Sequence, residues 1–260
     1  MKYYVADAFT DEVFKGNPAG VCVLDEWLQD DVMQKIAAEN NLSETAFVVK
    51  GKNKNEYDLR WFTPKAEIDL CGHATLGTSY VISNYVDVGT DKMIFHTASG
   101  ILEVNRKSDL YEMNFPTREP KKTQIPETIL DIIGVKPIET YLSRDLVIVV
   151  ETEEQVKNLA PDFSKMLKLE VGSGVIVTAK GSDVDFVSRC FYPKLGVNED
   201  PVTGSAHSNL IPFWSKRLNK DKMIAKQLSK RGGTLYCELC GDRVKISGRA
   251  SLYMVGNINI

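Results

Sequence analysis

The sequence lacks several features that mark whole classes of protein. No apolar run approaches the length of a membrane span, and the start, MKYYVADAFT, has no apolar signal-peptide region. The formal net charge is only −3, which gives no overall attraction to nucleic acid or to an acidic membrane. The five cysteines are odd in number and scattered, which indicates reduced thiols rather than a disulfide framework. These absences favour a cytoplasmic globular protein with neither a nucleic-acid nor a membrane partner.

What the sequence does contain is an internal repeat of about half its length. RWFTPK at residues 60–65 and RCFYPK at residues 189–194 both read Arg-x-Phe-x-Pro-Lys, at an offset of 129 residues. Downstream, Glu67 with a Gly-x-Ala turn corresponds to Glu199 with a second Gly-x-Ala turn, at an offset of 132 residues. Two further matches, one on each side of these, keep the same order. Matches in one order along the chain predict a duplicated architecture.

Each half has the same predicted elements, so the fold class is α+β with two pseudo-equivalent domains. Alternating apolar residues predict mostly antiparallel strands, and apolar spacing after each glycine turn predicts helices over 71–83 and 205–218. In each domain a curled sheet should surround its central helix, and the active site should lie in the cleft between the domains. The expected domains are 1–116 and 117–260, with a terminal strand that could cross back. The proline-rich and basic segment 116–128 is the expected linker.

Two other segments admit different interpretations. KRLNKDKMIAKQLSKR, at 216–231, reads as a basic helix with a solvated face, although a site for an anionic partner stays open. CELC, at 237–240, is a single Cys-x-x-Cys with no second pair, which is weak support for a structural zinc. In the repeat, Cys237 matches Val104 at an inward strand position, and Cys240 falls at a hairpin turn. We therefore expect no metal.

The two glycine turns predict where a ligand binds. Gly72 and Gly204 each precede a central helix, and a helix N-terminus is positive because its first N–H groups have no partner within the helix. Two such ends facing one cleft suit a small carboxylate-bearing molecule. The acids in EDPVTGSAH could alternatively cap the helix that follows them.

Functional residues of a duplicated protein should lie where the copies differ. Three polar residues have no equivalent in the other half: Glu44, His73 and Asp200. Their counterparts are Gly174 or Ser173, Ser205, and Ile68. Such asymmetric polar groups suit acid/base chemistry on a small molecule. The alternatives are a surface acid for Glu44, a turn acid for Asp200 and a structural histidine for His73; His207 could cap the helix or bind, and His96 has no assigned role.

Four ordered motifs resemble the PhzF family of phenazine-biosynthesis proteins, within the diaminopimelate-epimerase-like fold. They are DAFT with GNPAGV, SETAF, FTP with LCGHAT, and EDPVTGSAH, spread over residues 7–207. The resemblance implies a cofactor-free isomerase that shifts a proton on a small carboxylate-bearing substrate, and it also points to a homodimer. It implies that Glu44 is the acid/base carboxylate, that His73 and Asp200 are catalytic, and that Ser205 binds substrate with Gly72 and Gly204.

The sequence departs from the thiol epimerases of the same fold. Those enzymes use two opposed cysteines, each just before one glycine turn, whereas this chain has Cys71 at the first position and Thr203 at the second. A two-base thiol racemisation needs both groups, one on each face of the carbon. Cys71 is then either a small residue packed at a helix start or a thiol of low pKa. A non-catalytic protein that binds a small ligand or another protein through the same scaffold is the alternative function.

Overall fold

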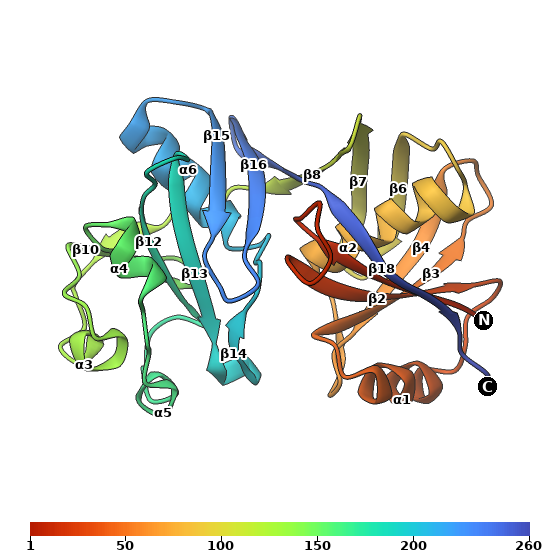
Figure 1. The fold of residues 1–260 in the computed structure, drawn as a ribbon, viewed down its shortest axis with the longest axis horizontal. Helices are drawn as coiled ribbons and strands as arrows, with labels where there is room; N and C mark the ends of the chain where they lie inside the picture. The colour runs from red at the N-terminus through yellow and green to blue at the C-terminus, as the bar shows by residue number, and fades with distance from the viewer. The chain divides into compact units, whose positions relative to one another are not determined.

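The first and last strands of the chain, β1 (Lys2–Ala8) and β18 (Ala250–Asn257), pair with each other in antiparallel fashion. The amino group of Met1 also donates to the carbonyl of Ile258 at 3.0 Å, and both termini lie at this end of the sheet (Figure 1). In the computed structural model, which describes residues 1–260, the chain therefore divides into unit 1, Met1–Asn114 with Ser247–Ile260, and unit 2, Phe115–Ile246. The last strand thus belongs to unit 1. None of the helices is both long and apolar enough to cross a membrane.

Unit 1 is built from strands that are mostly antiparallel and from two helices. Besides β1 and β18, the strands are β2 (Asn17–Leu24), β3 (Glu44–Lys50), β4 (Glu56–Phe62), β5 (Glu67–Ile68), β6 (Lys92–Thr97), β7 (Gly100–Lys107) and β8 (Leu110–Pro116). The helices are α1 (Asp30–Asn40) and α2 (Gly72–Val81), and α2 runs into a π-helical turn, Ile82–Val86. Parallel pairing occurs between β2 and β3 and between β4 and β6.

Unit 2 has the same order of strands around its own long helix. Its strands are β9 (Lys121–Thr123), β10 (Glu139–Leu142), β11 (Leu146–Val149), β12 (Val175–Lys180), β13 (Phe186–Tyr192), β14 (Val197–Asp200), β15 (Lys222–Gln227), β16 (Gly233–Cys240) and β17 (Arg243–Gly248). The helices are α3 (Ile129–Ile133), α4 (Glu153–Lys157), α5 (Phe163–Met166) and α6 (His207–Leu218), with a 3-10 turn at Pro193–Leu195. Strands β8 and β17 carry the chain across the two unit boundaries.

Strand pairing confirms the duplicated architecture. The parallel pairs β2–β3 and β4–β6 of unit 1 recur as the parallel pairs β11–β12 and β13–β15 of unit 2. The antiparallel pair β3–β4 likewise recurs as β12–β13. The predicted α+β class, with two similar curled sheets, is therefore confirmed.

The repeated Arg-x-Phe-x-Pro-Lys motif makes the same interactions in both units. Arg60 donates from Nε and from Nη2 to the two carboxylate oxygens of Glu67, both at 2.7 Å. Arg189 makes the same bidentate pair with Glu199, at 2.6 and 2.9 Å. Each guanidinium also lies over the ring of the phenylalanine two residues later, at 5.2 and 5.3 Å. The matched residues of the two sequences therefore hold β4 to β5 and β13 to β14.

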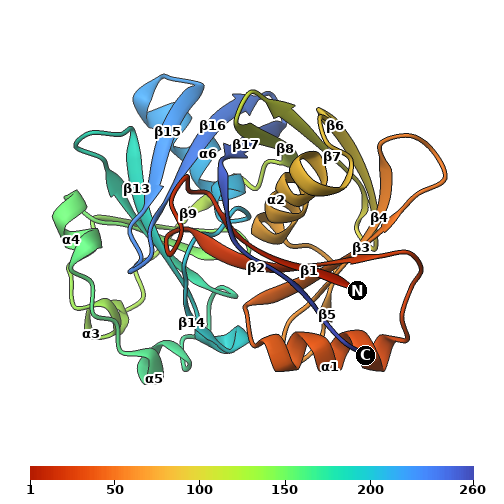
Figure 2. The same ribbon diagram turned by 45° about the vertical axis from the view of Figure 1, so that its right-hand side comes forward.

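Helix α2, labelled in Figure 2, is buried at eight of its ten residues, and most of these are small or apolar. A Cβ on Gly77 would lie only 3.3 Å from the Cβ of Ala19, so the helix packs directly against β2. Its hydroxyls bond within the helix: Thr75, Thr78 and Ser79 each donate to the carbonyl four residues earlier, at 2.5, 2.7 and 2.8 Å. Such back-bonding satisfies buried hydroxyls without outside partners. Helix α2 is therefore the central helix that the sequence predicts for the curled sheet of this unit.

Helix α6 takes the same central place in unit 2, with His207 to Ser215 buried and strands β13, β15 and β16 in front of it in Figure 1. It contains Pro212, which has no N–H to donate to the carbonyl of Ser208. The backbone N–H of Arg118 donates to that carbonyl instead, at 2.8 Å. The proline is tolerated because a neighbouring segment donates to the carbonyl that would otherwise lack a hydrogen bond.

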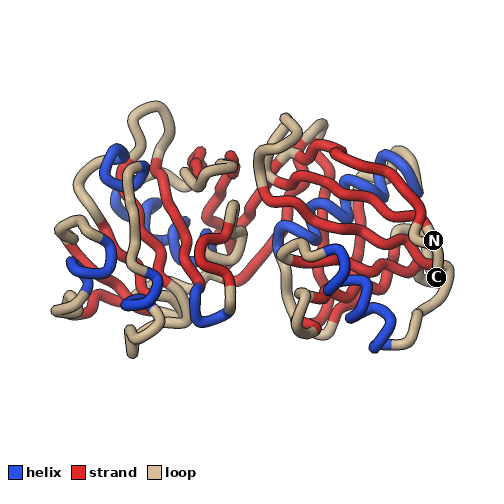
Figure 3. The backbone as a smooth tube through the Cα atoms, turned by 60° about the horizontal axis from the view of Figure 1, so that its bottom comes forward, coloured by secondary structure: helices blue, strands red, loops and turns tan.

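The outer face of each curled sheet is covered by the remaining helices, seen in blue in Figure 3. In unit 1, Met33 and Ile36 of α1 pack against Phe47 and Val49 of β3. In unit 2, helices α3, α4 and α5 share the equivalent role over β11 and β12. Strands with both faces covered account for the continuous apolar runs AFVV of β3 and LVIVV of β11 and the residue after it.

One expectation for unit 2 was wrong. The helix-like segment 216–231 is helical only to Leu218, because Asn219 adopts a left-handed conformation (φ 52°) that ends α6. Residues Lys222–Gln227 then form β15, whose alternating burial follows the strand period of two. Within the expected linker 116–128, Lys121–Thr123 forms β9 and pairs with β10.

Candidate active site

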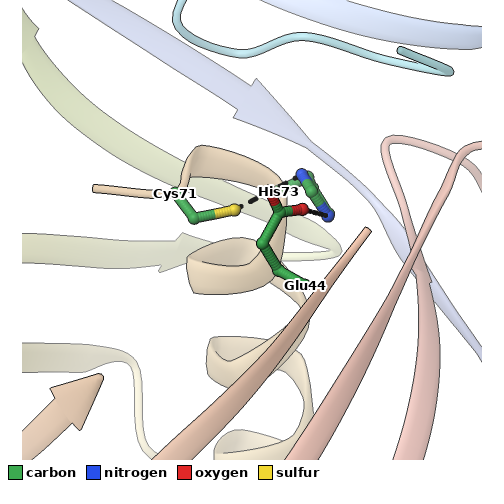
Figure 4. A group of neighbouring side chains, drawn as sticks. All are labelled: Glu44, Cys71 and His73. Carbon is green, nitrogen blue, oxygen red and sulfur yellow. Dashed lines mark hydrogen bonds and ion pairs between the residues drawn. The ribbon is translucent and has the colours of Figure 1, made fainter. Parts of the chain in front are cut away.

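Strand β3 and helix α2 bring Glu44 and His73 into contact (Figure 4). Glu44 is the first residue of β3, and the parallel pairing with β2 sets its register opposite Ala19. His73 is the second residue of α2. Its Nε2 lies 3.2 Å from Oε2 of Glu44, and the two side chains are only 7% and 16% exposed. Two of the residues predicted from the broken symmetry therefore meet at the N-terminus of the central helix.

His73 is uncharged at neutral pH. Burial lowers the pKa of its imidazole to about 3, because the cation would lose its hydration. The contact at 3.2 Å therefore joins a neutral ring to the Glu44 carboxylate and is not an ion pair between two charges. A neutral ring carries one proton, so one nitrogen donates and the other accepts.

The thiol of Cys71 faces the other nitrogen of the imidazole. Its Sγ is 3.5 Å from Nδ1 of His73, and the residue is buried. Figure 4 shows the three side chains clustered together, with each ring nitrogen turned to a different neighbour. His73 therefore contacts Cys71 through Nδ1 and Glu44 through Nε2.

The first turn of α2 leaves backbone donors for a ligand. Cys71 is the N-cap residue, and its side chain makes no capping hydrogen bond. The first bond of the turn runs from the N–H of Thr75 to the carbonyl of Cys71, at 3.2 Å. The N–H groups of Gly72 and His73 precede it and have no acceptor within the helix. This end of α2 therefore offers an anion-binding position beside Glu44.

In unit 2, Asp200 is held by the residues that follow it. Thr203 donates its hydroxyl to Oδ2 of Asp200 at 2.6 Å. Gln227 of β15 donates to the backbone carbonyl of Asp200 at 2.7 Å and accepts from the N–H of Thr203 at 2.9 Å. Asp200 does not cap α6, because the N-cap is Ala206 and no side chain caps that helix. Gly204 and Ser205 form the turn just before α6, with the carbonyl of Gly204 accepting from the N–H of His207.

His207 lies inside unit 2 rather than at the start of a ligand site. Its ring is fully buried, with Nδ1 donating to the carbonyl of Thr203 at 2.9 Å. Burial lowers the pKa of the imidazole to about 4. The ring also lies beside Phe186, with the centroids 5.8 Å apart. His207 thus supports the turn before α6 through a backbone contact.

The sequence did not identify three of the supporting residues: Cys71 as the partner of His73, and Thr203 and Gln227 as partners of Asp200. A signal existed for the first two, because Cys71 and Thr203 occupy the same place in the repeat, immediately before the glycine turns. Gln227 lies 24 residues from Thr203, on a strand that was expected to be helical, and nothing in the local sequence indicates the contact.

Glu44, Cys71 and His73 are also residue types that bind zinc, and one ligating atom of each lies within 4.8 Å of the other two. The arrangement fits a single ion poorly, however. His73 turns Nδ1 to the thiol and Nε2 to the carboxylate, whereas one metal ion binds one ring nitrogen.

CELC does not form a metal site on the strand that carries it. Cys237 and Cys240 are three residues apart in β16, so their side chains point to opposite faces. Cys237 is buried in the core, at 4% exposure, and Cys240 is partly exposed at the end of the strand. All five cysteines are free thiols, as the sequence predicted.

The chain is similar over its whole length to known proteins. The PhzC-PhzF family, described as phenazine biosynthesis-like protein, matches residues 6–256. A protein of Pseudomonas aeruginosa named an uncharacterized isomerase is 48% identical over 260 residues, covering 100% of this chain and 99% of that relative. The crystal structure of a PhzF family protein from Enterococcus faecalis superposes with a TM-score of 0.97 at 52% identity, covering 100% of this chain and 99% of that one.

A more distant structure shares only the fold. A hydroxyproline epimerase from Agrobacterium vitis gives a TM-score of 0.64 at 10% identity, covering 99% of this chain and 90% of the other. The fold is therefore that of the epimerase-like proteins, in agreement with the two repeated units. With the family match over nearly all residues, the chain belongs to the PhzC-PhzF family of phenazine biosynthesis-like proteins.

Proposed function

We propose that this protein is an isomerase that moves a proton on a small carboxylate-bearing substrate, with Glu44 as the acid/base group. The observation that carries the proposal is the contact between Glu44 and a neutral, buried His73. The name of the Pseudomonas aeruginosa relative, an uncharacterized isomerase, supports the reaction class and does not give a substrate.

The neutral imidazole suits a carboxylate that must both take and return a proton. With its proton on Nε2, His73 donates to Oε2 of Glu44 and orients the carboxylate without adding a positive charge beside it. Oε2 is inaccessible to solvent although the side chain as a whole is 16% exposed, so we assign the substrate proton to Oε1. A base held in this way removes a proton from an activated carbon and returns it at another position. General acid/base catalysis of this kind supplies about 10²–10⁴ in rate.

The N-terminus of α2 would hold the substrate carboxylate. The N–H groups of Gly72 and His73 and the positive end of the helix favour an anion at that point. An anion there lies next to the strand that begins with Glu44, so binding and proton transfer share one end of the central helix.

Asp200, Gly204 and Ser205 of unit 2 complete the proposed set. Asp200 would assist the second proton transfer, with its carboxylate oriented by the Thr203 hydroxyl at 2.6 Å. Ser205 and the N–H of Gly204 would bind a polar group of the substrate. The scheme uses carboxylates, an imidazole and backbone donors, and it draws on no metal or organic cofactor.

Solvent deuterium wash-in tests the reaction class. The protein is incubated in D₂O with a panel of small amino carboxylates and cyclic-diene carboxylates, and incorporation is followed by NMR and mass spectrometry. We expect incorporation at a carbon next to a carboxyl or a conjugated system in at least one compound. Binding of panel compounds without any incorporation would favour a ligand-binding protein instead.

A further inference from the structure

The position just before each glycine turn holds a hydrogen-bond donor in both units. Cys71 and Thr203 are equivalent in the repeat, at an offset of 132 residues, and each is buried. Thr203 donates its hydroxyl to Asp200 at 2.6 Å, and the Cys71 thiol faces Nδ1 of His73 at 3.5 Å. Each side chain therefore contacts a polar residue assigned to the reaction.

We propose that Cys71 is a positioning residue for His73: its S–H donates to Nδ1 and so keeps the ring proton on Nε2, facing Glu44. The inference rests on the proposed function, because it explains how Glu44 is oriented for proton transfer. It gives the thiol a role different from that of a base or a nucleophile.

The direction of the bonds follows from the chemistry of the three groups. An unprotonated imidazole nitrogen is a good acceptor, whereas sulfur is a weak one, so the thiol is better placed as donor to Nδ1. In the alternative arrangement the thiol would give up its proton, Nδ1 would carry the ring proton, and Glu44 would be protonated. Carboxylic acids are ordinarily stronger acids than thiols, so the proton stays on Cys71, Glu44 stays ionised and Nε2 carries the ring proton. The thiol then donates to Nδ1, and Nε2 donates to Oε2 of Glu44. The hydrogen bond from Cys71 also holds the ring against a flip that would turn Nδ1 away.

Nitrogen NMR of the free protein tests the assignment without any substrate. The chain has only three histidines, so the His73 resonances can be assigned by comparison with a His73→Gln variant. We expect Nε2 to carry the proton in the wild type and Nδ1 to show the shift of a nitrogen that accepts a hydrogen bond. In Cys71→Ala the Nδ1 resonance should move toward that of a nitrogen accepting no bond, and Cys71→Ser should restore it. A proton on Nδ1 in the wild type would overturn the inference even if neither Cys71 variant folds.

The exchange assay supplies a second readout. Cys71→Ala should lower kcat by about 2- to 10-fold, the range that one net hydrogen bond between neutral groups is worth. KM should stay unchanged because Cys71 does not touch substrate, and Cys71→Ser should recover most of the loss. If the wild type exchanges deuterium and Cys71→Ala exchanges it equally fast, the inference fails alone. If the wild type exchanges with no compound, the proposed function fails. The NMR result still decides how Cys71, His73 and Glu44 are hydrogen-bonded.

Discussion

Two buried neutral histidines should make the fold sensitive to mild acid. Burial lowers the pKa of His73 to about 3 and that of His207 to about 4, against about 6.5 for an imidazole in water. Between those values the unfolded chain binds more protons than the folded chain, so stability falls as the pH falls below 6.5. A pH of 5 is about 1.5 units below the unfolded pKa of each histidine. Keeping one ring neutral in the folded state therefore lowers the free energy of unfolding by about 2 kcal/mol.

His207→Asn isolates one of these contributions. The asparagine amide can still donate to the carbonyl of Thr203, which accepts from Nδ1 of His207 at 2.9 Å, but it does not titrate. Urea unfolding followed by circular dichroism gives the free energy of unfolding at pH 7.5 and at pH 5.0. The wild type should lose about 2 kcal/mol more than the variant between the two conditions. Equal losses, or a His207 resonance that titrates near pH 6.5, would refute the reasoning.

Two further substitutions test the repeat and the central helix by urea unfolding. Arg189→Ala should lower the free energy of unfolding by about 3–5 kcal/mol, because it leaves Glu199 and the carbonyls that Arg189 contacts without their buried partner. Arg60→Ala, at the more exposed equivalent pair, should lower it by about 1 kcal/mol or less. Equal costs would mean that burial does not distinguish the two copies. Gly77→Val should cost about 1–3 kcal/mol, since even a Cβ there lies 3.3 Å from Ala19, and an unchanged midpoint would show that α2 can move away from β2.

The repeat made the architecture predictable from sequence. Arg60 with Glu67 and Arg189 with Glu199 are matched in sequence because each pair makes the same bidentate contact in its unit. The glycine turns located both central helices, since α2 begins at Gly72 and α6 begins three residues after Gly204. The same comparison singled out Glu44 and His73, which the structure brings to 3.2 Å.

The errors and omissions have physical causes. Segment 216–231 is rich in residues that favour helices, but Met223, Ala225 and Gln227 are buried at every second position, and tertiary packing makes the segment a strand. Gln227 contacts Asp200 and Thr203 only because β15 pairs with β13, a parallel pairing that local sequence does not encode. The donor role of Cys71 depends on the direction in which the His73 ring faces, which no residue pattern specifies.

The most direct test of the central claim compares Glu44→Gln with Glu39→Gln in deuterium wash-in, using a compound that the wild type exchanges. The amide of Glu44→Gln can still bond to His73 but cannot take a proton, and Glu39 is an exposed acid of the same unit on α1. We predict that Glu44→Gln lowers the exchange rate by about 10²–10⁴ while Glu39→Gln leaves it unchanged. Exchange by Glu44→Gln at the wild-type rate would contradict the account and place the acid/base group elsewhere.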